Sequence, residues 1–292
     1  MYSGGENIME QRRQLRVLIV GRQDNFQRIL VTNIQCWGYE AVVLPSASLL
    51  RDDETLDISG DVLLYDLDEP FRKMTGNGSS SLRYGLLTND LISRYSKQWP
   101  RTLFTIVLSS RSVSRVMLEQ IGAIALLLKP FEMGRLQRYL RVLQRLVLSD
   151  ADMLPSQYQS STRQTHDEKL RVLVVDDDID VAHAIRQCLV YEPGYEVAVA
   201  HDGLEALEQC LDWHPQCVVT DLIMPWMNGY QVMRCLSAGS LPTMPAFVVM
   251  SALTQLESPV NRSYLDGKAV AYVDKPFHID HLLTAIKQVC PE

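Results

Sequence analysis

The chain has 292 residues, of which 47% are apolar, and this is enough for two domains of about 100–150 residues each. No apolar run approaches the roughly 20 residues that cross a bilayer, and residues 1–14 lack the apolar core of a secretory signal. Six scattered cysteines without a CxxC motif and a net charge of −7 predict a cytoplasmic protein, without disulfides or a large basic face for nucleic acid.

The first half of the chain alternates short apolar, β-branched runs with longer stretches of helical pattern. The polar residues 1–14 predict a flexible N-terminus ahead of these runs. Apolar runs without polar alternation are typical of parallel strands that are covered on both faces. We expect strands near 15–20, 40–44, 61–66, 103–108 and 124–128, and a last helix over about 132–149.

The second half follows the same plan after a polar, Ser- and Gln-rich stretch at 150–169, which predicts a linker. The apolar runs predict strands at 170–175, 195–199, 217–221, 246–250 and 270–273. Between and after them there is room for helices at 178–190, 203–212, 228–237, roughly 254–266 and 278–289.

An internal repeat relates the two halves. Four short matches occur in the same order in both: LRVL at 15 and 170, GYE at 38 and 194, the strand-ending Asp66 and Asp221, and KPF at 129 and 275. These matches predict two copies of one domain. Five β/α units in each copy predict a doubly wound α/β fold with a five-stranded parallel sheet, over residues 15–149 and 170–290.

Polar side chains follow the strands of the second copy where each strand ends. These residues are Asp176, Asp177, Asp221, Ser251 and Lys275. Because the carboxyl ends of parallel strands share one edge of a sheet, we expect them to lie together. Three carboxylates repel one another unless a cation is present, and oxygen ligands alone favour a hard cation such as Mg²⁺. A lysine and a hydroxyl can hold phosphoryl oxygens, so the set predicts phosphoryl chemistry.

Each of these residues also has an ordinary structural interpretation when it is taken alone. The acidic run at 176–178 could cap a helix, Asp221 could be a turn residue, and Lys275-Pro276 is a common loop dipeptide. Their joint occurrence, in order and at strand ends, favours the functional interpretation.

The second copy closely resembles the receiver domain of two-component response regulators. The resemblance rests on VLVVDDD at 172–178, VVTDLIMPWMNGY at 218–230, VVMSA at 248–252 and YVDKPF at 272–277. It implies that Asp221 accepts a phosphoryl group from a partner's phosphohistidine and that the domain has no other enzymatic activity. It also implies that Mg²⁺ is bound by the acidic pair Asp176 and Asp177, by Asp221 and by the backbone carbonyl of Ile223. Ser251 and Lys275 would contact the phosphoryl group, and Ser251 and Tyr272 would form a conformational switch. The Lys275–Pro276 bond would be cis.

The resemblance also bears on the lifetime of the phosphorylated form. In the family, the residues two beyond the acceptor and two beyond the hydroxyl flank the path of the hydrolytic water. Here they are Ile223 and Leu253, and neither side chain can orient water. We expect slow self-dephosphorylation, although both residues could also be ordinary packing choices.

The first copy departs from this pattern and resembles a degenerate, or pseudo-, receiver. Gly21 and Arg22 stand where the acidic pair would be, whereas Asp66, Ser109 and Lys129 remain. A lone carboxylate does not hold Mg²⁺ tightly. One hypothesis is that Arg22 pairs with Asp66 and replaces the cation, and the alternative is a scaffold or dimer surface on which Arg22 is merely solvated.

The last helix expected in the first copy carries two stripes. Leu136, Leu140, Leu143 and Val147 are expected to pack on the domain's own sheet. Arg135, Arg138, Arg141 and Arg145 are typical of a solvated face, with docking to an acidic partner or to the second copy as the alternative. The charges of the halves fit this alternative, because residues 1–150 carry 19 Lys and Arg against 16 Asp and Glu, and residues 151–292 carry 9 against 19.

Together these features predict a phosphorelay signalling protein that receives its phosphoryl group from a histidine kinase or a histidine phosphotransfer protein. With no room expected for an output domain after Cys290, a downstream protein would recognise a changed surface around Tyr272. A homodimer is a further candidate assembly, and no direct nucleic-acid partner is expected. The alternatives are a phosphorylation-gated adaptor or scaffold, and the receiver portion of a larger hybrid kinase or DNA-binding regulator.

Overall fold

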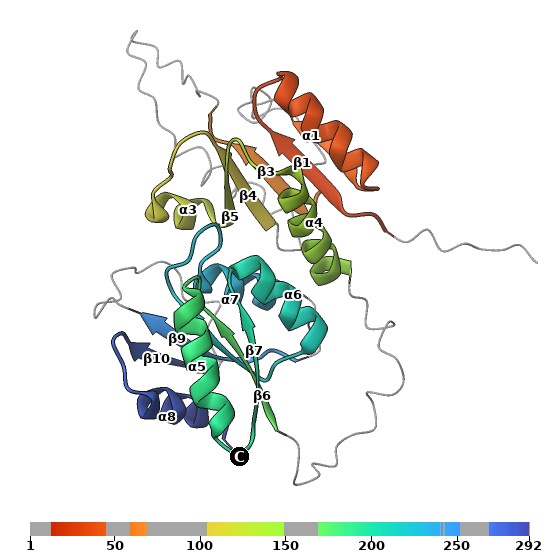
Figure 1. The fold of residues 1–292 in the computed structure, drawn as a ribbon. Coiled ribbons are helices and arrows are strands. Elements are labelled where there is room, and N and C mark those ends of the chain that lie inside the picture. The colour runs from red at the N-terminus through yellow and green to blue at the C-terminus, as the bar shows by residue number, and fades with distance from the viewer. Residues whose placement is uncertain are drawn as a thin grey trace, which may run out of the picture.

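The computed structural model describes residues 13–44, 59–68, 104–148, 169–239, 241, 243–251 and 269–291. Within these residues the chain forms two five-stranded, all-parallel sheets with helices on their faces (Figure 1). Most of the expected N-terminal tail and linker, the helix expected near 254–266, and Leu253 lie outside the described residues. None of the described helices combines the length and apolar character needed to cross a bilayer.

The first sheet has the strand order β2-β1-β3-β4-β5, and we call the elements that build it the first domain. Its strands are β1 (Arg16–Val20), β2 (Glu40–Leu44), β3 (Val62–Asp66), β4 (Phe104–Ser109) and β5 (Ala123–Leu128). Its described helices are α1 (Asn25–Cys36), α3 (Arg115–Ile121) and α4 (Met133–Leu148).

The second sheet has the equivalent order β10-β9-β8-β6-β7, and its elements form the second domain. Its strands are β6 (Leu170–Val175), β7 (Tyr195–Ala200), β8 (Cys217–Asp221), β9 (Ala246–Ser251) and β10 (Val270–Asp274). Its described helices are α5 (Ile179–Tyr191), α6 (Gly203–Trp213), α7 (Gly229–Ala238) and α8 (Ile279–Val289).

The expected α/β fold is therefore confirmed, and each strand ends within one residue of its predicted position. The central strands are buried along their length, with all six residues of both β4 and β9 inaccessible, as their unbroken apolar runs indicate. Helix starts follow local capping chemistry. The Asn228 side chain accepts from the backbone N–H of Gln231, whose side chain accepts in return from the N–H of Asn228.

Helix α4 of the first domain packs across α6 and α7 of the second (Figure 1). A single apolar cluster contains buried residues of both domains, including Leu136, Tyr139 and Leu146 on α4 and Leu207 on α6. Leu146 lies so close to Gly239, at the end of α7, that a methyl group added there would come within 2.7 Å of Leu146 Cδ2. Burial of this shared apolar surface holds the domains together.

Three arginines of α4 form ion pairs with acidic residues of the second domain. The pairs are Arg135–Asp202 at 3.1 Å, Arg138–Glu208 at 2.6 Å and Arg145–Asp212 at 2.7 Å, and only Arg141 of the predicted stripe is exposed away from them. The favoured expectation of a solvated arginine face was wrong. Helix α4 lies between the two domains, so its arginine stripe meets acidic residues of the second domain and not solvent alone. These pairs are partly exposed and contribute little energy each, so they set the orientation of α4 more than its stability.

Truncating Leu146 tests the shared core. Leu146→Ala should lower the free energy of unfolding by about 2–4 kcal/mol, because the side chain is 1% exposed and its removal leaves a cavity against α7. Urea denaturation followed by circular dichroism measures this loss. The matched control is Ile29→Ala on α1, whose side chain is 51% exposed. A loss for Leu146→Ala no larger than that of the control would contradict the packing described here.

Candidate functional site

The carboxyl ends of β6 and β8 bring three aspartates together. Asp176 and Asp177 follow β6, and Asp221 ends β8. One carboxylate oxygen from each lies within 4.8 Å of the others. Asp176 is buried, Asp221 is half-buried and Asp177 is exposed, so the cluster opens to solvent on one side. The third acid of the run, Asp178, instead caps α5 by accepting from the N–H groups of Asp180 and Val181.

Lys275, just beyond β10, joins this cluster. Its Nζ lies 2.8 Å from Oδ2 of Asp176 and 3.3 Å from Oδ1 of Asp221. The other hydrogen bond to Asp221 Oδ1 comes from the backbone N–H of Leu222 at 2.8 Å. One ammonium thus faces two carboxylates, and the net charge of the group stays negative.

The electrostatics of the cluster would favour a bound cation. Burial raises the pKa of Asp221, Lys275 lowers it, and the neighbouring charge of Asp176 raises it again, with a net increase. Burial alone would lower the pKa of Lys275, but its hydrogen bond to Asp176 and the charge of Asp221 raise it. The donor atoms are all carboxylate oxygens, which suit Mg²⁺ and not a soft metal.

The remaining predicted residues lie around this cluster. Ser251 ends β9 and is 4% exposed, and its carbonyl accepts from the backbone N–H of Lys275 at 2.6 Å. Tyr272 on β10 is 39% exposed and Ile223 is 53% exposed. The Lys275–Pro276 bond is cis.

The loop after Asp221 contains two features whose roles the sequence did not reveal. A Cβ added at Gly229 would come within 2.6 Å of the carbonyl oxygen of Asp221, so only glycine allows α7 to start this close to β8. Trp226 adopts a left-handed backbone conformation with φ of 67°, which is uncommon for a residue with a large side chain. The MNG motif could have signalled the glycine, but no local signal marks the conformation of Trp226.

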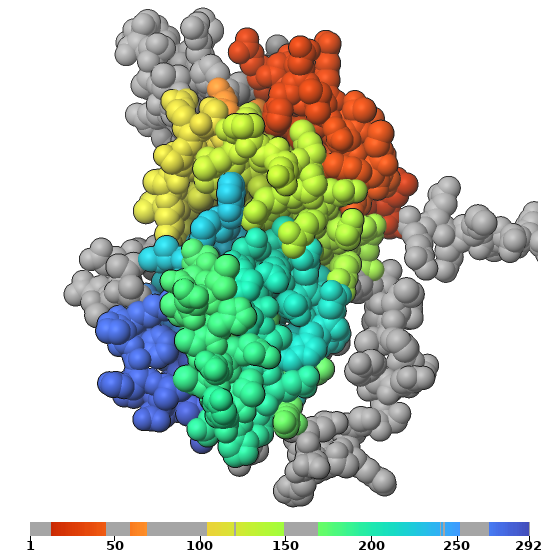
Figure 2. Space-filling view, viewed as in Figure 1, coloured from red at the N-terminus to blue at the C-terminus, as the bar shows by residue number. Residues whose placement is uncertain are grey.

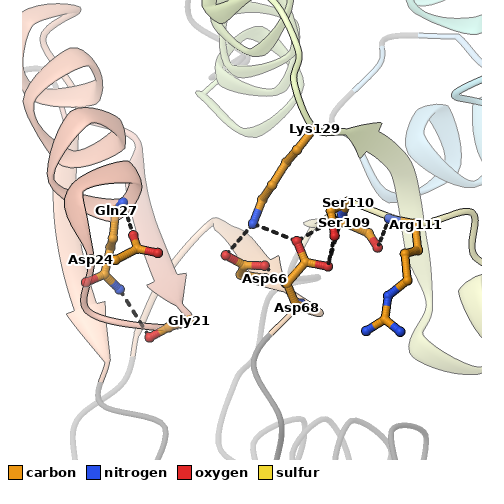
Figure 3. A network of polar contacts seen from close by, with 9 residues as sticks. All are labelled: Gly21, Asp24, Gln27, Asp66, Asp68, Ser109, Ser110, Arg111 and Lys129. Atoms are coloured by element: carbon orange, nitrogen blue, oxygen red, sulfur yellow. Dashed lines mark hydrogen bonds and ion pairs between the residues drawn. The ribbon is translucent and has the colours of Figure 1, made fainter.

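The equivalent edge of the first domain is arranged differently (Figure 3). Lys129 Nζ lies 2.6 Å from Oδ2 of Asp66 and 3.1 Å from Oδ2 of Asp68, and the ring of Phe26 covers the ammonium at 4.5 Å. Arg22 is exposed and forms no ion pair with Asp66 in the described part of the chain. The hypothesis that Arg22 neutralises Asp66 was therefore wrong. Lys129 takes that role although it follows β5, two strands away from β3, because its long side chain reaches across the end of β4.

Ser109, Ser110 and Arg111 extend the network shown in Figure 3. Asp68 accepts hydrogen bonds from the backbone N–H and the hydroxyl of Ser110, and buried Ser109 accepts from the N–H of Arg111. Burial raises the pKa of Asp68, but the bonds from Ser110 and Lys129 outweigh it and the pKa is lowered.

Gly21 excludes an acidic side chain from this edge. A Cβ at this position would lie 2.7 Å from Cβ of Asp66. The first domain thus cannot regain the first acid of the pair without moving Asp66. Lys129 is paired with both of its carboxylates, and no third carboxylate joins them among the described residues, so this edge lacks the arrangement found in the second domain.

Comparison with known proteins relates the second domain to signalling proteins. Residues 172–287 match the family of the response regulator receiver domain. The response regulator MprA of Mycobacterium tuberculosis strain H37Ra is 38% identical over 119 residues, which is 40% of this chain and 49% of that protein. MprA of Mycobacterium ulcerans is 37% identical over 120 residues, again 40% of this chain and 49% of that protein. The chain spans about half the length of the curated relatives it matches.

Two solved structures are similar to part of the chain. A receiver domain from Bermanella marisrubri is 30% identical, with 42% of this chain and 99% of that chain covered and a TM-score of 0.34. The response regulator domain of Thermotoga maritima CheB is 26% identical, with 42% and 96% covered and a TM-score of 0.37.

Removing the lysine of the first domain tests its role. Lys129→Ala should lower the free energy of unfolding by about 1–3 kcal/mol at neutral pH, because two partly buried carboxylates lose their counter-ion. A carboxyl group with a lowered pKa stabilises the folded state above its unfolded pKa, and that contribution disappears as the pH falls. The difference between wild type and variant should therefore shrink in acid.

Denaturation at several pH values measures this difference, with Lys287→Ala on the exposed face of α8 as the control. A loss that is independent of pH would show that the ion pairs are not its source.

Proposed function

We propose that this protein, a response regulator by virtue of its receiver domain at residues 172–287, accepts a phosphoryl group on Asp221. The donor would be the phosphohistidine of a sensor histidine kinase or of a histidine phosphotransfer protein. The observation that carries the proposal is the meeting of Asp176, Asp177 and Asp221 within 4.8 Å, with Lys275 beside them. We assign residues 15–149 to a degenerate receiver and 170–290 to the phosphorylatable one, with 1–14 and 150–169 as tail and linker.

The proposed reaction is a displacement at phosphorus. A carboxylate oxygen of Asp221 forms the new O–P bond as the N–P bond of the phosphohistidine breaks, and the electron pair returns to the imidazole. Lys275, which is already paired with Asp176 and Asp221, is placed to form an ion pair with one of the phosphoryl oxygens. Asp176, Asp177, Asp221 and the carbonyl of Ile223 would hold Mg²⁺, which neutralises phosphoryl charge when bound.

Signalling would follow from a conformational change that reaches the surface around Tyr272. The Ser251 hydroxyl would contact the phosphoryl group, and Tyr272 on β10 would turn inward as Ser251 moves. The described contacts of the first domain use α6 and α7, whereas Tyr272 lies on the edge strand β10 beside α8. This arrangement supports a downstream protein that recognises the surface around Tyr272, and a homodimer stays a prediction.

An adaptor in which the first domain captures a partner has less support. The face formed by α3, β5 and α4 already contacts α6 and α7 of the second domain. A captured partner would have to use another face of the first domain or displace the second.

The acceptor assignment predicts a simple contrast between the domains. With acetyl phosphate and Mg²⁺, wild-type protein should gain one phosphoryl group per chain, Asp221→Asn should gain none, and addition of EDTA should prevent the reaction. The matched control is Asp66→Asn, the equivalent residue of the first domain, which should behave as wild type. Intact mass spectrometry measures the incorporation, and phosphorylation of the Asp221→Asn variant would exclude the assignment.

The lifetime of the phosphorylated form gives a second prediction. Ile223 beside the acceptor is apolar and half-exposed, and it offers no group that could orient a water molecule. The phosphoprotein, freed of donor, should therefore lose its phosphoryl group over hours. A time course of phosphate release tests this, with an Ile223→Glu variant expected to decay faster, and complete loss from wild type within a minute would refute it.

A further inference from the structure

We propose that the first domain acts as a clamp on the loop at residues 222–228 of the second domain and thereby strengthens its binding of Mg²⁺. This inference rests on the proposed function, because it concerns the metal site at Asp221. The loop connects Asp221 to α7 and carries the Ile223 carbonyl, the one ligand proposed for Mg²⁺ that comes from the backbone.

The loop lies against the edge strand of the first sheet. The backbone N–H of Leu126 on β5 donates to the carbonyl of Trp226 at 3.0 Å. The Gln231 side-chain amide donates to the carbonyl of Ala123, also on β5, at 3.0 Å, and this bond is buried. Figure 2 shows a cyan segment of the second domain projecting into the yellow and green surface of the first. The loop therefore completes hydrogen bonds at the β5 edge, which has no further strand beside it in the described sheet.

Arg135 holds the side chain of Trp226 from the other side. The guanidinium lies 4.6 Å from the centre of the indole ring, and Nη2 pairs with Oδ2 of Asp202 at 3.1 Å. Asp202 is the N-cap of α6, where its other carboxylate oxygen accepts from the N–H of Glu205. Arg135 thus connects the loop tip to a fixed helix start.

The opposite side of the loop is closely packed as well. A Cβ at Gly203, the first residue of α6, would lie 2.7 Å from both Cγ and the carbonyl oxygen of Met227. Met227 itself is 1% exposed. Met227 is therefore closely packed against the start of α6, whereas Trp226 stays 37% exposed and contacts the first domain on one side.

Local and inter-domain contacts together hold Trp226 in its left-handed conformation. Such a backbone is unfavourable for a bulky residue and persists only where the surroundings determine it. Within the loop, the backbone N–H of Met227 donates to the carbonyl of Pro225 at 2.7 Å and closes a tight turn around Trp226. The first domain adds the Leu126 hydrogen bond and the Arg135 stack, which hold this turn against β5 and α4. Without them the loop would gain other conformations, and fewer of these would present the Ile223 carbonyl to the ion.

Arg135 is therefore a positioning residue, and its removal should lower the affinity for Mg²⁺ without changing the rate of the reaction at saturating Mg²⁺. For Arg135→Ala, the Mg²⁺ concentration that gives half-maximal phosphorylation by acetyl phosphate should rise about threefold to tenfold, whereas the rate at saturating Mg²⁺ should stay close to that of wild type. Arg135→Lys should restore only part of the affinity, because an ammonium keeps the charge but not the planar stack.

The matched control is Arg141→Ala, which removes an exposed arginine from the same helix. In a Trp226→Gly background, which keeps the backbone conformation accessible, Arg135→Ala should have no further effect. Wild-type affinity in Arg135→Ala would overturn the clamp and leave the proposed function intact. Failure of wild type to react at all would overturn both.

The coupling must also act in the reverse direction. Binding of Mg²⁺ and beryllofluoride at Asp221 should slow hydrogen exchange of the Leu126 amide in the first domain by at least about threefold. The Lys129 amide, which donates to Ser109 within the first domain, should not change. NMR measures both amides in the full chain, with Asp221→Asn as the negative control. An unchanged Leu126 amide in the beryllofluoride-bound wild type would refute the clamp.

Discussion

Repulsion between carboxylates at the edge of a parallel sheet is the constraint that both domains must meet. Parallel strands bring their carboxyl ends to one edge, and acidic residues placed there are forced together in a partly buried setting. The second domain balances three carboxylates with a single lysine and is left with excess negative charge. The first domain has two carboxylates that share Lys129, under the ring of Phe26. The same fold thus supports one edge with three carboxylates, whose charge would favour a bound cation, and one edge with two carboxylates paired to an enclosed lysine.

The two domains are not independent bodies joined by a chain. They share an apolar cluster around α4, and the arginines of that helix face acids on α6. The same contact reaches the loop beside Asp221 through Trp226. The first domain, whose sheet edge lacks the three-carboxylate cluster, thus contacts the loop beside that cluster in its neighbour.

Much of the fold and of the candidate site could be predicted from the sequence. Unbroken apolar runs marked the strands to within one residue, and polar residues at strand ends marked the cluster at Asp176, Asp221 and Lys275. These features depend on local pattern and on the geometry common to all parallel sheets. The repeat then transferred the same reasoning to the first domain.

The errors concern contacts that local pattern does not contain. Arg22 and Lys129 both stood near Asp66 in the expected topology, and only side-chain reach and the covering Phe26 decide for Lys129. The arginine stripe of α4 was visible, but its partners on α6 lie some seventy residues away in sequence, so periodicity could not pair them. The contacts that hold the turn at Trp226 against β5 and α4 likewise come from elements that are remote in sequence.

The double-sided burial of α4 has a consequence for how the chain can change over evolution. Deletion of the first domain would uncover the apolar side of α6 and α7 that shares a buried cluster with α4, and an uncovered apolar face of this kind favours aggregation. The solubility of the second domain alone therefore favours retention of the first.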